Sequence, residues 1–249
     1  MKKLIAPAAV ATCGAALAVE SANIVGYNGH AMPAGDTVYR VATFEGIGGT
    51  SETFTLGQIS VGEEDFAWWN GDYIATVDEY GSQDTYYTWD PDASGWFEAD
   101  PDSGAPIADK PATDVQFPIN KGVLVFSANG ANLTFSGAVL AGDTELYGGA
   151  GETTYTGNFT PTTITLGDIV VGEEDFAWWN GDYIATIDPY GSQDTYYTWD
   201  PDADGWFEAD PDSGAPIADK PAGDIEFEAN MGFLFFTANG ATLNIPSPL

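Results

Sequence analysis

Two acidic turns carry the side chains best suited to binding a metal ion. Asp200, Asp202 and Asp204 stand at alternate positions directly before Gly205. Calcium loops use carboxylates at this spacing, with glycine where the chain bends sharply. The alternative is a tight hairpin turn, in which proline presets φ, aspartate caps the turn and glycine takes a positive φ. The predicted calcium ligands of the two copies of this turn are Asp90, Asp92, Ser94, Glu98, Asp200, Asp202, Asp204 and Glu208.

Aromatic side chains stand beside these acids. Adjacent residues on a strand point to opposite faces, so Trp68 and Trp69 cannot both be buried in a one-sided core. An exposed ring beside carboxylates suits stacking on a sugar, but it equally suits a protein contact or an aromatic cover over a thin sheet. The predicted ligand or lateral-contact residues are Trp68, Trp69, Tyr87, Trp89, Trp96, Trp178, Trp179, Tyr197, Trp199 and Trp206.

Catalytic chemistry has a weaker basis in the sequence. A carboxylate pair such as Asp65 with Asp72 could act as in a glycosidase. The chain contains 38 acidic residues, however, so such pairs are expected by chance. The only histidine, His30, has no twin in the second half, which excludes a histidine-based triad or zinc site present in both halves. We therefore expect a protein that is not an enzyme.

The first 18 residues have the pattern of a secretory signal. Lys2 and Lys3 precede an apolar stretch from Leu4 to Leu17, and Ala16-Leu17-Ala18 has the small-x-small pattern of a cleavage site. No later apolar run is long enough to span a bilayer, so we expect no transmembrane segment. The sequence predicts a secreted protein, located outside the cell or at the cell surface.

The charge balance excludes whole classes of partner. The formal net charge is −32, and removal of the signal would leave four basic residues against 38 acidic ones. Nucleic acids and anionic lipids both need cationic surfaces, so neither is an expected partner. The aromatic content of 14% is too high for a disordered acidic tail. The chain is expected to fold.

The sequence contains an internal repeat. A shift of 110 residues aligns Gly62–Ala112 with Gly172–Ala222, and only three positions differ. Looser similarity continues on both sides, and AGDT occurs at 34–37 and again at 141–144. We predict a signal peptide at 1–18, a first repeat at 19–138 and a second at 139–249, each large enough for its own core.

Inside each repeat the pattern is that of β-strands. DYIATVDE and TYYTWD alternate around a turn and GWFEAD follows, which predicts a three-stranded meander. GVLVFSA and ANLTFSG flank Asn129-Gly130, which predicts a second hairpin. DPDSGAPIADKPA reads as an irregular connection. The expected fold is all-β, with two tandem antiparallel β-sandwich or barrel-like repeats of about 110 residues.

The junction of the repeats suggests a mode of assembly. If the two AGDT segments are equivalent, residues 131–139 occupy in the second repeat the place that the opening strand NIVGY occupies in the first. One shared strand would then leave a free strand at each end of the chain, and end-to-end pairing of copies would build fibres or arrays. The predicted head-to-tail contact residues are Asn23, Ile24, Val25, Tyr27, Leu243 and Ile245.

Several short motifs resemble a known group of proteins. They are SANIVGY after the signal, AGDTVYRVATF, the Tyr-x-Trp and Gly-Trp hairpin, and the Asn-x-Gly-(Phe/Val)-Leu strand that leads to TFSG. The pattern is similar to an uncharacterised family of secreted bacterial β-repeat proteins that open with Asn-(Ile/Val)-Val-Gly-Tyr. The resemblance implies a β fold and export, and it implies nothing about mechanism.

Two functions follow as hypotheses. The first is a structural or adhesive protein of the cell surface or extracellular matrix that self-associates head-to-tail as a homopolymer, with calcium as its stabilising cofactor. The alternative is a calcium-assisted carbohydrate-binding protein, whose exposed tryptophans contact extracellular polysaccharide.

Overall fold

The computed structural model describes residues 25–41, 44–45, 53–62, 65–78, 82–118, 121–139, 143–158, 160–172, 176–188 and 192–246. The chain is all-β, and its strands form several antiparallel sheets with the sandwich arrangement that the sequence predicts. No helix among these residues has the length and apolar character needed to cross a membrane. The signal-like segment, Asn23 and Ile24 lie outside the described residues.

The first repeat is built around a six-stranded antiparallel sheet. In spatial order its strands are β2 (Thr37–Val41), β11 (Gly122–Phe126), β6 (Tyr73–Val77), β7 (Gln83–Asp90), β8 (Gly95–Ala99) and β9 (Pro106–Pro111). The predicted meander is confirmed by β6, β7 and β8. The segment expected to be irregular contains β9, which prolines can enter because it is the edge strand and pairs on one side only.

A smaller sheet packs against the six-stranded sheet and encloses the core of the repeat. It consists of β1 (Val25–Met32), β12 (Ala131–Val139), β3 (Phe44–Glu45) and β5 (Ile59–Val61), with β4 (Thr53–Thr55) and β10 (Gln116–Pro118) as a separate pair. Phe54, Phe66, Trp96 and Phe135 are fully buried in this core. Alternation along β7 places one face of the large sheet toward these side chains.

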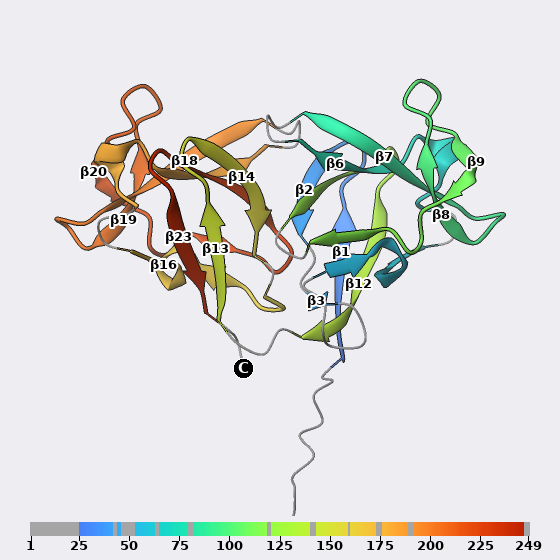
Figure 1. The fold of residues 1–249 in the computed structure, drawn as a ribbon, viewed down its shortest axis with the longest axis horizontal. Helices are drawn as coiled ribbons and strands as arrows, with labels where there is room; N and C mark the ends of the chain where they lie inside the picture. The colour runs from blue at the N-terminus through green and yellow to red at the C-terminus, as the bar shows by residue number, and fades with distance from the viewer. Residues whose placement is uncertain are drawn as a thin grey trace, which may run out of the picture.

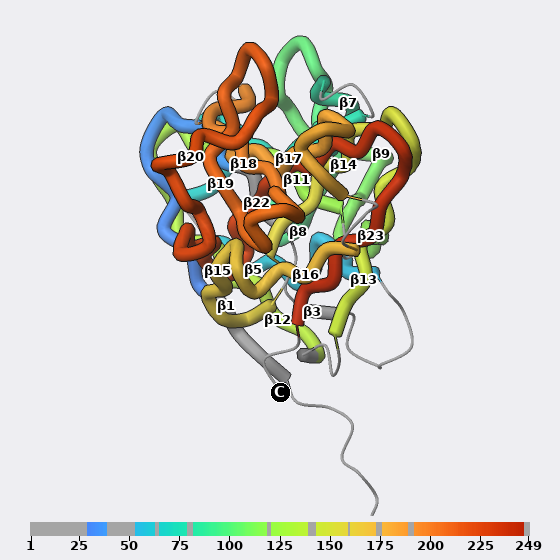
Figure 2. Tube along the Cα trace, turned by 90° about the vertical axis from the view of Figure 1, so that its left-hand side faces the viewer, coloured from blue at the N-terminus to red at the C-terminus, as the bar shows by residue number. Residues whose placement is uncertain are grey.

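The second repeat follows the same plan. Its large sheet has the order β14 (Glu152–Gly157), β22 (Gly232–Thr237), β17 (Tyr183–Ile187), β18 (Gln193–Asp200), β19 (Gly205–Ala209) and β20 (Pro216–Pro221). The smaller elements are β13 (Thr144–Gly148), β23 (Ala241–Ile245), β16 (Val170–Val171), β15 (Ile164–Thr165) and β21 (Glu226–Phe227). In Figure 2, β13, β16 and β23 lie below β14, β17 and β18, as expected for two packed layers.

Four short 3₁₀ helices complete the described structure. They are η1 (Leu56–Gln58), η2 (Trp68–Asn70), η3 (Leu166–Asp168) and η4 (Trp178–Asn180). The expectation that Trp68 and Trp69 lie on a strand is therefore wrong. Gly71, at φ +83°, ends η2 in the left-handed region that suits glycine, and the chain turns there before entering β6.

The predicted hairpin at Asn129-Gly130 is also wrong. β11 already pairs with β2 and β6 on its two edges, whereas β12 pairs with β1, β3 and β5. The Asn-Gly turn thus carries the chain from the large sheet to the small one. Gly130 has φ +80°, a backbone conformation that disfavours residues with a side chain. A Cβ there would also lie only 3.1 Å from the carbonyl oxygen of Met32, so steric crowding disfavours a side chain as well.

The shared strand predicted at the junction does not exist. β12 pairs with strands of its own repeat, and the second repeat has its own first strand, β13, which pairs with the closing strand β23. The true counterpart of AGDT at 34–37 is AGET at 150–153. Gly35 and Gly151, both at positive φ, donate equivalent N–H bonds to Ser127 and Thr237 at 2.8 and 2.7 Å.

The premise of the predicted head-to-tail contact, an unpartnered strand at each end, is wrong for the same reason. β1, which contains Val25 and Tyr27, pairs with β12 over its whole length. Leu243 and Ile245 are buried, and their strand β23 lies between β13 and β16 with partners on both edges. β23 therefore has no free edge for strand addition, whereas β1 is the edge strand of its sheet. Both strands have a partner within the chain, so neither is the unpartnered strand from which the junction was predicted.

The two repeats lie side by side, with β2 and β14 near the centre and β9 and β20 at the outer ends (Figure 1). Each large sheet turns its second face toward the other repeat. Ala75 and Leu124 from the first repeat are buried there, and Tyr86, Tyr155 and Ile187 pack against them. This explains the adjacent pair at 86–87, because Tyr87 enters the core of its repeat while Tyr86 joins the contact between repeats.

Candidate functional site

Six of the ten aromatic candidates are structural. Trp96 and Trp206 are buried, and their indole Nε1–H groups donate to the carbonyl oxygens of Ile59 and Ile169 at 3.3 and 3.4 Å. Trp89 and Trp199 pack edge-to-face on them, with ring centroids 5.7 Å apart in both repeats. Together with the buried Tyr87 and Tyr197, Trp96 and Trp206 belong to the two cores, and the partly buried Trp89 and Trp199 pack against them.

The other four candidates form an exposed feature in each repeat. We call residues 67–72 and 177–182 the tryptophan turns. Trp69 is 48% exposed and Trp179 is 50% exposed. Each is held edge-to-face by its half-buried neighbour, Trp68 or Trp178, at centroid distances of 5.8 and 5.9 Å. Both turns therefore present one large apolar ring to solvent in the same local geometry.

A buried carboxylate fixes each tryptophan turn. Asp72 is 1% exposed, and its two oxygens accept the backbone N–H groups of Ala67 at 2.9 Å and Ala128 at 2.7 Å. Asp182 makes the matching bonds in the second repeat. Because Ala128 lies in the Asn-Gly turn between the two sheets, the carboxylate ties the tryptophan turn to the frame of the repeat. From the sequence, Asp72 was considered only as one member of a catalytic carboxylate pair, but its place between Gly71 and an apolar strand indicates a cap.

The acidic turns have the geometry of hairpin turns. An oxygen of Asp90 accepts the N–H of Asp92 at 3.0 Å, and Asp200 accepts that of Asp202 at the same distance. Ser94 and Asp204 both adopt φ +50°, so each takes a left-handed conformation beside its glycine. In the described ranges, no three histidine, cysteine, aspartate or glutamate side chains are placed to hold a metal ion together.

The glutamates expected to complete the calcium shell lie elsewhere. Glu98 stands opposite Tyr87, three residue pairs along the ladder from the turn pair Asp90 and Gly95. That separation is about 10 Å at 3.3 Å per residue, too far for one calcium ion with oxygen ligands at about 2.4 Å. Glu98 instead forms an ion pair with Lys110, as Glu208 does with Lys220. These two glutamates are therefore removed from the candidate metal ligands.

A second acidic turn follows each of these. One oxygen of Asp100 accepts the N–H and the hydroxyl of Ser103, both at 2.9 Å, and Asp210 does the same with Ser213. Hydrogen bonds from the serine backbone, then from its hydroxyl, hold the pKa of Asp100 and of Asp210 below the ordinary aspartate value. The acids act here as caps within a turn.

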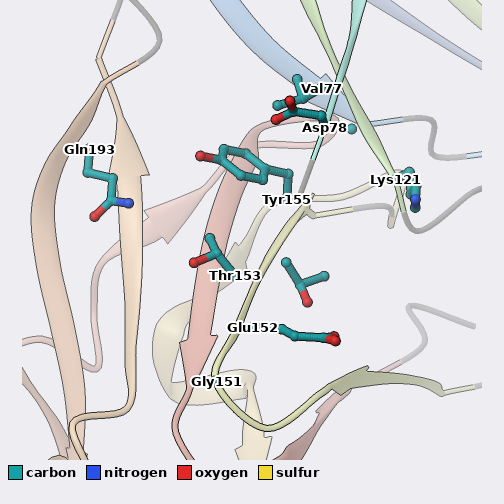
Figure 3. Close-up of a pocket in the computed structure, with 10 residues that line it drawn as sticks. Val77, Asp78, Lys121, Gly151, Glu152, Thr153, Tyr155 and Gln193 are labelled. Carbon is teal, nitrogen blue, oxygen red and sulfur yellow. The ribbon is translucent and has the colours of Figure 1, made fainter. Parts of the chain in front are cut away.

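A polar pocket of about 660 Å³ lies where the repeats meet, and sequence reasoning did not find it. Val77, Asp78 and Lys121 line it from the first repeat, and Glu152 and Tyr155 are among the residues that line it from the second. Figure 3 shows these side chains around Tyr155. Burial, and then the negative charge of Asp78, raise the pKa of the Tyr155 hydroxyl. The pocket exists only when both repeats are docked, so no local motif encodes it.

Comparison with known proteins returns no match, whether with protein-family models, with curated proteins or with solved structures. The resemblance of the opening motifs to a secreted β-repeat family thus stays a prediction.

Proposed function

We propose that this chain is an exported, non-catalytic protein that binds a neutral extracellular polysaccharide through its two tryptophan turns. The observation that carries the proposal is the exposure of Trp69 and Trp179 in matching turns, each clamped by a neighbouring ring and a buried carboxylate. Neither ring belongs to the buried core of its repeat.

 The chain holds 8 tryptophans, 12 tyrosines and 14 phenylalanines, and these two rings are among the few large apolar side chains exposed in the described residues.

Sugar chemistry fits these turns. The apolar C–H face of a sugar ring packs against a flat indole, while its hydroxyl groups stay hydrated or bond to nearby polar groups. A neutral polysaccharide also approaches a chain of net charge −32 without repulsion, whereas an anionic polymer does not. Neutral, repeating sugar chains are therefore the favoured ligand class, and two turns per chain make the protein bivalent.

The direct test is depletion of the protein by insoluble neutral polysaccharides. Cellulose, chitin and starch granules serve as the probes, and the variant is the double substitution W69A/W179A. We expect at least one probe to deplete the intact protein and none to deplete the variant. Tyr147→Ala is the matched control, because Tyr147 is an aromatic side chain that is 71% exposed and lies outside the tryptophan turns. Equal depletion of the intact protein and the double variant would reject the proposal.

Self-association into a structural or adhesive layer is the second candidate. The same exposed rings favour it, since an apolar ring on the surface also suits a contact between proteins. The net charge opposes it, because copies of the chain repel one another unless cations screen them. Sedimentation of the intact protein and of W69A/W179A, at low and high salt, tests this candidate. Oligomers that disappear in the variant and grow with salt would favour it over polysaccharide binding.

Calcium stays a prediction in both cases, and it falls on the turn Asp200–Gly205. Calcium bound there would raise the unfolding temperature of the intact protein, and chelator would lower it again. Asp204→Ser gives the second turn the sequence of the first, so it would reduce this rise. An unfolding temperature that chelator and calcium both leave unchanged would limit these acids to their role in the turn.

A further inference from the structure

The contact between the repeats has two corresponding sides. β2 contacts β22 and β11 contacts β14, which is the reciprocal pattern of an approximate twofold arrangement. The polar pocket lies on the side where β14 meets the first repeat. The near identity of the repeats would place a similar pocket on the other side, where β2 meets the second repeat.

The two sides of the contact differ at the position of the pocket lysine. Lys121, on the wall of the pocket, corresponds to Met231 under the shift of 110 residues. Met231 packs against the core of the second repeat, and the preceding Asn230 is fully buried. His30 of the first repeat reaches across to Asn230, with Nε2 2.6 Å from Oδ1. One side, which we call the closed side, therefore has a hydrogen bond between the repeats where the other has the polar pocket and the ammonium group of Lys121.

The pocket combines opposite charges. Lys121 brings an ammonium group from the first repeat, while Asp78 and Glu152 bring one carboxylate from each repeat. Lys121 forms no ion pair with any described residue, in contrast to Lys110 and Lys220, which are both paired. The remaining wall offers hydroxyl and amide groups from Thr153, Thr154 and Gln193. A volume of about 660 Å³ is within the usual range of small-molecule sites.

We propose that this pocket binds a small zwitterion, a free amino acid or a dipeptide. Its carboxylate would pair with Lys121, and its ammonium group with one of the two carboxylates, that of Glu152 or that of Asp78, which also accepts the N–H of Ser82. A simple anion would meet those two carboxylates and the negative charge of the whole chain, and a simple cation would meet Lys121. A zwitterion satisfies both sets of charges and carries no net charge into the field of the protein. This site is separate from the tryptophan turns and stands independently of the proposed polysaccharide binding.

The test uses four forms of one dipeptide that differ only in their end charges. They are dialanine, its N-acetyl form, its C-terminal amide, and the form blocked at both ends. Calorimetric titration of the intact protein is expected to show binding of dialanine, at least tenfold weaker binding of each singly blocked form, and none of the doubly blocked form. Absence of dialanine binding at millimolar concentration, or equal binding of any blocked form, would overturn the proposal.

Lys121→Met tests the site itself, because it copies the residue of the closed side. We expect at least a tenfold loss of dialanine affinity in this variant. Lys110→Met removes the same charge on an exposed strand outside the pocket lining and is expected to leave the affinity unchanged. Both lysines are exposed, so thermal unfolding of both variants should match that of the intact protein. Unchanged dialanine affinity in Lys121→Met would place the binding elsewhere and refute the assignment.

Discussion

The two repeats share their buried interactions within each repeat and differ at the contact between them. The buried acids Asp72 and Asp182, the aromatic cores and the tryptophan turns are the same in both. At the contact, however, His30 corresponds by strand register to Leu146, since it lies opposite Leu133 as Leu146 lies opposite Leu243. Duplication thus preserved what each repeat needs to fold, and divergence at the contact produced one closed side and one open side.

The largest expected effect is the loss of stability when the buried aspartate of either repeat is removed. Asp72→Ala and Asp182→Ala each leave two backbone N–H groups, on Ala67 and Ala128 or on their counterparts, without their acceptor. A buried group left unsatisfied costs about 1–3 kcal/mol, so each variant, with two such groups, should lose about 2–6 kcal/mol of unfolding free energy. Urea unfolding measures the loss, and the two values should agree within about 1 kcal/mol if the frames are equivalent. Asp109→Ala, on an exposed edge strand, is the control. A large difference between the two losses would break the comparison.

Bivalent binding is the next largest effect. On a surface coated with the polysaccharide that depletes the protein, Trp69→Ala and Trp179→Ala should each weaken apparent affinity by about 100-fold, because one of two linked contacts is lost. Titration with a short soluble oligosaccharide should instead show half the stoichiometry and an unchanged affinity. A single variant that loses all binding to both probes would show that the two turns are not equivalent.

A smaller effect concerns the closed side of the contact. His30→Leu introduces the residue type of Leu146 and removes the bond to Asn230. Asn230→Gly removes the other partner while keeping a residue that tolerates φ +62°. A double-mutant cycle on urea unfolding should give a coupling energy of about 0.5–1.5 kcal/mol. A coupling energy near zero would mean that this bond does not join the repeats.

Local sequence patterns predicted several strands, but they did not predict which distant strands pair with one another. Alternation in DYIATV and TYYTWD is enough to identify β6 and β7. The sequence AGDT at 141–144 is identical to that at 34–37, but the structural counterpart is AGET at 150–153. Only the pairing of the strands that follow, β2 with β11 and β14 with β22, shows this. Strand register is set by the whole sheet, so a four-residue match cannot decide it.

The candidate site was predictable only in part, for a related reason. Exposed rings were expected among ten aromatics, and the structure leaves Trp69 and Trp179 as the most exposed of these. Carboxylates at alternate positions suit both a calcium loop and an aspartate-capped turn, so spacing alone could not choose between them. The place of Asp72 after Gly71 indicates a cap, but its bond to Ala128, 56 residues away, follows from no local pattern. The pocket depends on docking of the repeats, which no local pattern encodes.

The smallest effect compares two equivalent caps that differ in charge. At the start of η1 the side chain of Gln58 accepts the N–H of Thr55 at 2.8 Å, and at η3 the carboxylate of Asp168 accepts that of Thr165 at 2.7 Å. The bonds from the N–H and then the hydroxyl of Thr165 hold the pKa of Asp168 below its ordinary value. A lowered pKa means that this stabilisation is present above the ordinary aspartate pKa and is lost as pH falls through the folded-state pKa.

Acidification below about pH 4 should therefore weaken this cap in the second repeat and leave the cap of the first unchanged. Asp168→Gln copies the first repeat, and its unfolding temperature should fall slightly less between pH 7 and pH 3 than that of the intact protein. The reciprocal Gln58→Asp should make the first repeat slightly more sensitive to acid. The turns of Asp100 and Asp210 titrate alike in both repeats, so they cancel from this comparison. Circular dichroism melts at the two pH values measure the effect, and identical pH dependence in all three proteins would show that the charge of this cap contributes nothing to stability.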